Sequence, residues 1–156
     1  MWLLLGCAPQ DVGWSFSHAQ LDEAVEGYDT WESAPGWEGL NATCTGAHGR
    51  YVALYVDPIA AEEDAGSGGY GVGSTMVLES YQDTLGTWKM TVAMHKVALD
   101  SNLPGDWYWG QYDEAGALLQ GGDIPACASC HMGGKDYAWH RGRAASDCGG
   151  ETEEPV

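Results

Sequence analysis

The stretch Arg50-Tyr-Val-Ala-Leu-Tyr-Val-Asp57 predicts the centre of the fold. Aliphatic and aromatic residues fill it without a break, so both of its alternating sides are apolar. Strands of this kind are covered on both faces of a sheet. We therefore expect an inner, central strand over residues 50–57.

Three further stretches have strand character, at residues 73–81, 87–97 and 106–113. In the first of them, the two-residue period places Met76 and Leu78 on one face. The connections between these stretches are short, which favours antiparallel pairing. We therefore predict an α+β fold with an antiparallel β-sheet of about four to five strands.

Helical patterns flank these strands. Residues 17–33 repeat apolar side chains at three- and four-residue steps, and Ser15 or Ser17 is placed to cap the start of a helix. A short helix is expected over residues 58–64, and a turn of helix over 136–143. The predicted fold thus has an N-terminal helix and a helical C-terminal segment.

The segment Cys127-Ala128-Ser129-Cys130-His131 has the C-x-x-C-H pattern that attaches a c-type haem. Two thiols three positions apart on a helical turn can each add to one vinyl group of the same porphyrin. The next residue then offers an imidazole nitrogen to the iron. We therefore predict one covalent haem c, bound by Cys127, Cys130 and His131, with His131 as the metal ligand.

Three other interpretations of the two cysteines stay open. They are a zinc site completed by His140 or Cys148, a redox dithiol, and a structural disulfide. Zinc sites usually have a second close pair of ligands, and a thioredoxin-type dithiol needs a βαβ setting, neither of which the sequence shows clearly. The short spacing would strain a disulfide. Haem attachment is therefore the favoured interpretation.

The composition restricts the class of partner. The chain has 156 residues, with 6 Lys and Arg against 23 Asp and Glu, and a net charge of −17 at pH 7. Such a surface repels phosphate backbones, so we expect no nucleic-acid partner. It would steer a basic redox protein partner towards the chain, although strong acidity also serves simply to keep a protein in solution.

The first residues resemble a targeting signal. Met1-Trp-Leu-Leu-Leu-Gly-Cys7 is similar to a bacterial lipobox, in which the cysteine becomes the lipidated first residue. The apolar run is short and no basic residue precedes it, so a buried or free Cys7 is the alternative. In bacteria, c-type haem is attached outside the cytoplasmic membrane. We therefore expect an exported protein, periplasmic or lipid-anchored at Cys7.

The same reasoning divides the chain. Residues 1–14 are expected to be a signal remnant and linker, 15–148 a single haem domain, and 149–156 a disordered acidic tail. Cys44 and Cys148 are then left over in an oxidising compartment, so we expect them to pair as a disulfide.

Several short motifs occur in the order seen in a known family. They are Tyr-x-x-Trp at 28–31, Tyr-Val-Asp-Pro at 55–58, Val-Leu-Glu at 77–79, Met-x-Lys at 94–96, Gly-Asp-Trp-Tyr-Trp at 105–109, the haem motif at 127–131 and Asp-Tyr at 136–137. Over roughly residues 28–140 the chain resembles the cytochrome P-460 family, which includes the cytochromes c′-beta. The resemblance implies an antiparallel-sheet fold, a frequent homodimer, and one haem with a proximal histidine and an open distal position.

One departure from that family concerns its function. Its hydroxylamine-oxidising members carry a lysine, crosslinked to the porphyrin, at the position of Leu78. Leucine has no nucleophilic nitrogen, and Lys96 on the neighbouring strand would be an unusual replacement. Members without the crosslink bind small gases such as nitric oxide, and a pocket with Met76 and Leu78 on its wall suits a neutral diatomic ligand.

The sixth iron ligand is left open by the sequence. The candidates are Met76, Met90, Met94, His18, His48, His95 and His140, or no protein ligand at all. We therefore keep three hypotheses for the function. They are binding of a small diatomic ligand at an open site, electron transfer with a protein sixth ligand, and oxidation of hydroxylamine, nitric oxide or peroxide as a haem enzyme.

Overall fold

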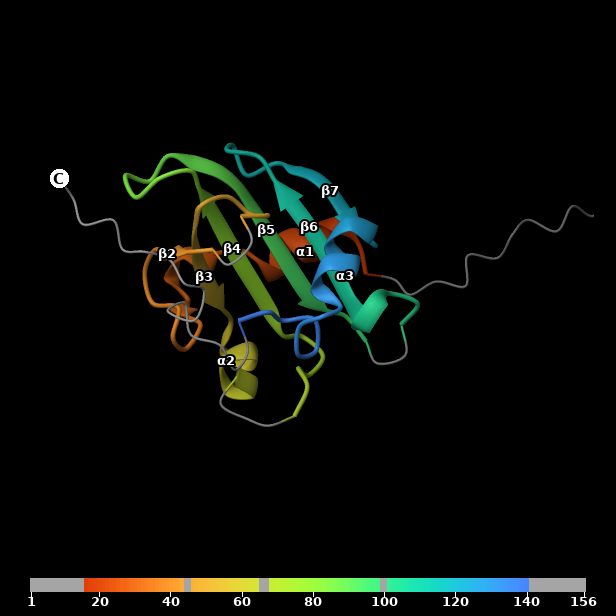
Figure 1. Cartoon of the computed structure of the whole chain (residues 1–156). Helices are drawn as coiled ribbons and strands as arrows, with labels where there is room; N and C mark the ends of the chain where they lie inside the picture. Colours follow the sequence, from red (N-terminus) through yellow and green to blue (C-terminus); the bar gives the residue numbers. More distant parts are fainter. Residues whose placement is uncertain (1–15, 44–45, 65–67, 99–100, 141–156) are drawn as a thin grey trace, which may run out of the picture.

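An antiparallel sheet dominates the computed structural model, which describes residues 16–43, 46–64, 68–98 and 101–140 (Figure 1). Within these ranges it has seven strands. They are β1 (Glu32–Ser33), β2 (Asn41–Ala42), β3 (Tyr51–Val56), β4 (Thr75–Tyr81), β5 (Trp88–Lys96), β6 (Trp107–Tyr112) and β7 (Leu118–Gly122). Their order is β1-β3-β4-β5-β6-β7, and β2 also pairs with β3.

The predicted α+β class with an antiparallel sheet is confirmed, but the count of four to five strands is wrong. Two of the additional strands, β1 and β2, are two residues long and carry no periodic pattern. The third, β7, ends in two glycines, which weaken a strand signal. β3 is an inner strand as expected, whereas β4 and β5 lie nearer the middle of the sheet.

Helix α1 (His18–Ala24) covers one face of the sheet. Ser17 caps its start in a capping box with Gln20, and its fully buried Leu21 packs in a cluster with Val77 and Tyr108. The predicted extension of this helix to residue 33 is wrong. Gly27 has φ 73° and ends the helical path, so a 3₁₀ turn, η1 (Tyr28–Thr30), and then β1 follow.

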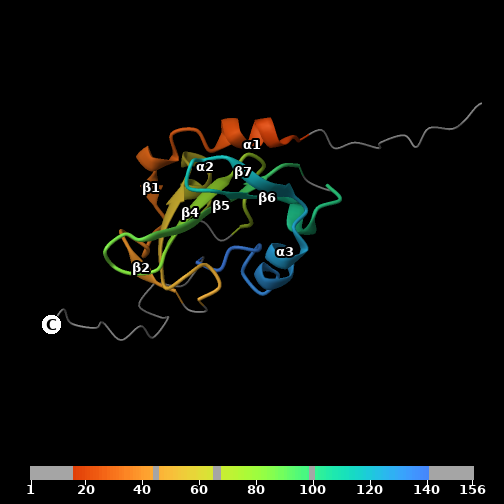
Figure 2. The same ribbon diagram turned by 90° about the horizontal axis from the view of Figure 1, so that it is seen from above.

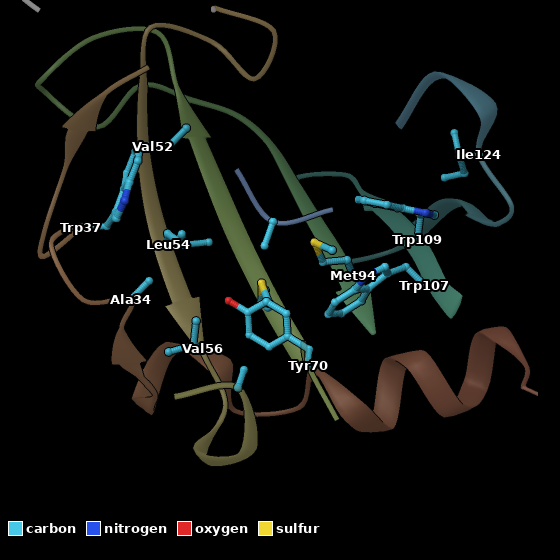
Figure 3. Close-up of a cluster of buried hydrophobic side chains, with 13 residues drawn as sticks. Ala34, Trp37, Val52, Leu54, Val56, Tyr70, Met94, Trp107, Trp109 and Ile124 are labelled. Carbon is cyan, nitrogen blue, oxygen red and sulfur yellow. The ribbon is translucent and has the colours of Figure 1, made fainter. Parts of the chain in front are cut away.

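The opposite face of the sheet carries the larger core. Figure 2 shows α1 on one side of the sheet and α3 (Pro125–His131) on the other. Figure 3 shows Trp37 beside Val52 at one side of this core and Met94 and Trp109 at the other. Helix α2 (Pro58–Asp64), at the predicted place, contributes Ala60, whose backbone N–H bonds the Asp57 carboxylate. The short 3₁₀ turn η2 (Pro104–Asp106) leads into β6.

The segment after α3 is not the predicted turn of helix. Residues 135–138 form a tight turn closed by a bridge between Lys135 and Ala138, with positive φ at Asp136 (48°) and Tyr137 (64°). Left-handed backbone at two successive residues is incompatible with an α-helix. Residues 141–143, the two ends at 1–14 and 149–156, and Cys7, Cys44 and Cys148 lie outside the described ranges.

Candidate haem site

A cavity of about 380 Å³ lies between the sheet and α3. Its volume falls in the range of small-molecule and cofactor sites, about 300–1,000 Å³. The five site residues that the sequence singles out all line it: Cys127, Cys130, His131, Met76 and Leu78. Strand β4 and helix α3, which are distant in sequence, therefore meet where the motif predicts a cofactor, and the lining is mostly apolar.

Helix α3 presents both thiols to the cavity. Pro125 begins the helix, and the i, i+3 spacing of Cys127 and Cys130 puts them on one side of it. Cys127 is half-buried and Cys130 is exposed, so one thiol lies inside the cavity and the other at its edge. Both are free, and the disulfide interpretation is not realised in this structure.

His131 is oriented by its second nitrogen. Nδ1 lies 2.7 Å from the backbone carbonyl of Tyr137, and because a carbonyl only accepts, Nδ1 carries the proton and donates it. This leaves the lone pair on Nε2, the arrangement found in metal-ligating histidines. Burial lowers the pKa of His131 below its usual value, which favours the neutral imidazole that a metal needs.

The turn that supplies this carbonyl is anchored by Asp136. Its carboxylate accepts from Lys96 Nζ (2.9 Å) and from the backbone N–H of Tyr70 (2.7 Å), and its carbonyl accepts from Trp107 Nε1 (3.0 Å). Lys96 Nζ also donates to the carbonyl of Gly105 at 2.8 Å. Lys96 is thus engaged in a buried ion pair, away from the cavity wall, and offers no amine for a crosslink to a cofactor.

Trp109 provides a test of whether a haem fits. Its ring lies 4.8 Å from that of His131, between centroids, and it lines the cavity. Its Nε1 is buried and has no hydrogen-bond partner in the part of the chain that the structure describes. A buried donor without an acceptor is costly. The carboxylates of a haem are acceptors and could accept from this donor. A haem therefore fits the features of the site, which are two thiols, one oriented imidazole, apolar walls and one unmatched donor.

The described residues give less support to a zinc site than to a haem site. No group of three or more His, Cys, Asp or Glu side chains with metal-binding geometry occurs in residues 16–43, 46–64, 68–98 and 101–140. His140, one of the proposed zinc ligands, instead has its Nε2 3.2 Å from the hydroxyl of Tyr70. Cys148 lies beyond the described ranges.

The structure sorts the candidates for the sixth ligand. His18 and His95 lie on the α1 side of the sheet, where they contact Tyr108 and Phe16 respectively. Met90 does not line the cavity and contacts Gln111. Four candidates do line it: Met76, Met94, His48 and His140.

Comparison with known proteins gave no matching protein-family model and no match among curated proteins. The resemblance to the cytochrome P-460 family therefore stays a prediction. None of the helices in the described ranges is both long and apolar enough to cross a membrane.

Proposed function

We propose that this chain is an exported c-type cytochrome with one covalent haem, whose cavity binds a small diatomic ligand such as nitric oxide. One observation carries the proposal: the two thiols and the imidazole of the C-x-x-C-H motif line a single apolar cavity, with His131 Nδ1 already bonded to Tyr137. An iron held there would supply a site for a diatomic gas or for a single electron.

The residues of the chain have separate roles in this proposal. Cys127 and Cys130 hold the macrocycle by thioether bonds, and His131 presents Nε2 to the iron. Met76 (2 % exposed) and the half-buried Leu78 form an apolar wall from β4 that excludes water. Such a wall favours a neutral diatomic ligand over a charged one because it offers no partner to a charge.

Covalent attachment is tested directly. The chain is produced in a bacterial host that has the c-type haem attachment machinery and is then denatured. We expect haem absorbance to stay with the polypeptide, and to be lost in Cys127→Ala/Cys130→Ala but kept in Ser129→Ala. A wild-type polypeptide that loses all haem on denaturation would contradict the proposal.

Electron transfer is a second candidate, and the place of His48 on the cavity wall favours it. The edge of the site is also accessible, because Cys130 and the neighbouring Met132 are exposed. A basic redox partner would be attracted by the charge of −17. A haem enzyme acting on nitric oxide or peroxide needs the same site, and the side chain of Leu78 disfavours a crosslinked hydroxylamine-oxidising site.

A further inference from the structure

We infer that His48 is the sixth ligand of the iron, opposite His131, so that the haem is held between two histidines until a gas displaces His48. This inference rests on the proposed haem attachment. It selects one sixth ligand from the seven candidates that the sequence leaves open. It also predicts how the diatomic ligand reaches the iron.

The distance between the two imidazoles carries the inference. The ring centroids of His48 and His131 are 5.9 Å apart, with 70° between the ring planes. Two imidazoles that share one metal through bonds of about 2 Å have centroids roughly 6 Å apart. The angle is compatible with shared ligation, because coordination fixes the direction of each Nε2 lone pair and not the angle between the two ring planes.

The backbone around His48 is fixed by a side chain of the same loop. Thr43 Oγ1 donates to the carbonyl of Gly49 (2.7 Å) and accepts from the N–H of Gly46 (3.0 Å). Gly46 and Gly49 both have positive φ, 66° and 106°, and a bond from Gly49 N–H to the Gly46 carbonyl closes a turn. His48 therefore lies on a formed turn at the cavity wall.

The other cavity-lining candidates are held by the protein core. His140 Nε2 is engaged with the hydroxyl of Tyr70. Met76 and Met94 face each other across β4 and β5 and are 2 % and 6 % exposed, so their side chains are core residues of the sheet. His48 is half-buried and lies on a loop. The structure places its ring at a shared-metal spacing from the ring of His131.

A consequence for gas binding follows. A ligand that needs the same coordination position binds only to the fraction of molecules in which His48 has left the iron. If His48 is bound about 90 % of the time, the apparent Kd of the gas is raised about tenfold. His48 would then act as an internal competitor that sets the affinity for the diatomic ligand.

The test uses the haem-loaded full chain. We expect the oxidised wild type to be low-spin by electron paramagnetic resonance, with a near-infrared magnetic circular dichroism band of bis-histidine ligation. His48→Ala should become high-spin and, once reduced, bind carbon monoxide about tenfold more tightly. His48→Met should stay low-spin but with a higher reduction potential, because thioether ligation raises it. His95→Ala, on the other face of the sheet, is the matched control and should behave as the wild type.

The outcomes separate the two proposals. A high-spin wild type, or a low-spin His48→Ala, would overturn ligation by His48 while haem attachment stands. If the wild type carries no covalent haem, the proposed function itself fails. Should His48→Ala not fold, the spectrum of the wild type and the potential of His48→Met still decide the matter.

Discussion

Lys96 Nζ lies 2.9 Å from Asp136 Oδ1 and 4.9 Å from the centre of the Trp107 ring, and this buried pair joins β5 to the turn that orients His131. The lysine side chain is 6 % exposed and the aspartate 20 %. The ion pair thus holds the turn that accepts the hydrogen bond of His131, and its loss should lower the stability of the fold.

We expect Lys96→Met to lower the free energy of unfolding by about 3 kcal/mol, because it leaves the Asp136 carboxylate partly buried without its cation. Urea denaturation of the variant and the wild type measures the difference. Lys135→Met, at an exposed lysine beside Asp136, is the control and should change stability by less than about 0.5 kcal/mol. Equal losses in the two variants would show that the buried pair does not contribute specifically.

The approach of α1 to the sheet depends on Gly110. A Cβ at this position would clash with the side chain of Leu21, which α1 directs at the sheet and which is fully buried. We expect Gly110→Ala to lower the free energy of unfolding by about 1–3 kcal/mol, because α1 must shift to accommodate a methyl group. Thermal or urea unfolding measures this. Gly68→Ala, where the added carbon meets nothing within 4 Å, should be close to neutral.

The partner of Gly110 across the sheet explains why β7 is hard to predict from the sequence. Gly110 of β6 pairs with Gly121 of β7, and a Cβ on Gly121 would come within 3.1 Å of His18. The two glycines let α1 lie close to the sheet, and Gly121 also removes a β-forming side chain that would have helped to indicate β7. A tertiary requirement has thus replaced the local signal.

The site shows a similar division. The C-x-x-C-H motif and the alternation on β4 are local patterns, so the sequence could place Cys127, His131, Met76 and Leu78 on one site. Two other features come from contacts between residues far apart in the chain. These are the hydrogen bond from His131 to a carbonyl on a left-handed turn, and the approach of His48 from the loop between β2 and β3. No periodicity encodes either of them.

A carboxylate on the α1 face binds three tyrosines. Glu79 accepts hydrogen bonds from the hydroxyls of Tyr28 (2.7 Å), Tyr81 (2.7 Å) and Tyr55 (3.2 Å). Burial, and then the bond and charge of Glu79, raise the pKa of Tyr28 to about 12, and the pKa of Tyr55 and Tyr81 is raised by the same causes. The folded state therefore favours the neutral phenols.

The sign of the resulting pH dependence follows from proton binding. Above the ordinary tyrosine pKa of about 10, the folded state holds protons that the unfolded state has lost. The contribution of the cluster to stability should thus be complete below pH 10 and fall as the pH rises towards 12. Denaturation at several pH values measures it. Glu79→Gln should make stability depend less on pH in this range. It should also move the ultraviolet titration of Tyr28 towards lower pH, where the Tyr28 signal is isolated by comparison with Tyr28→Phe. An unchanged titration would contradict the role of Glu79.

The side chain of Leu78 limits the space in the cavity, so its size tests the proposed gas binding. Leu78 lines the cavity from β4 opposite Val92 of β5, so a larger side chain there projects into the space available to a ligand. We expect Leu78→Phe in the haem-loaded protein to slow carbon monoxide association and weaken its binding, because the ring occupies part of the pocket. Leu119→Phe, at a 61 % exposed position on β7, is the control and should leave both quantities unchanged. Laser photolysis of the carbon monoxide complex measures the association rate, and visible titration the affinity. If Leu78→Phe binds the gas as the wild type does, the ligand must occupy a part of the cavity that this side chain does not reach.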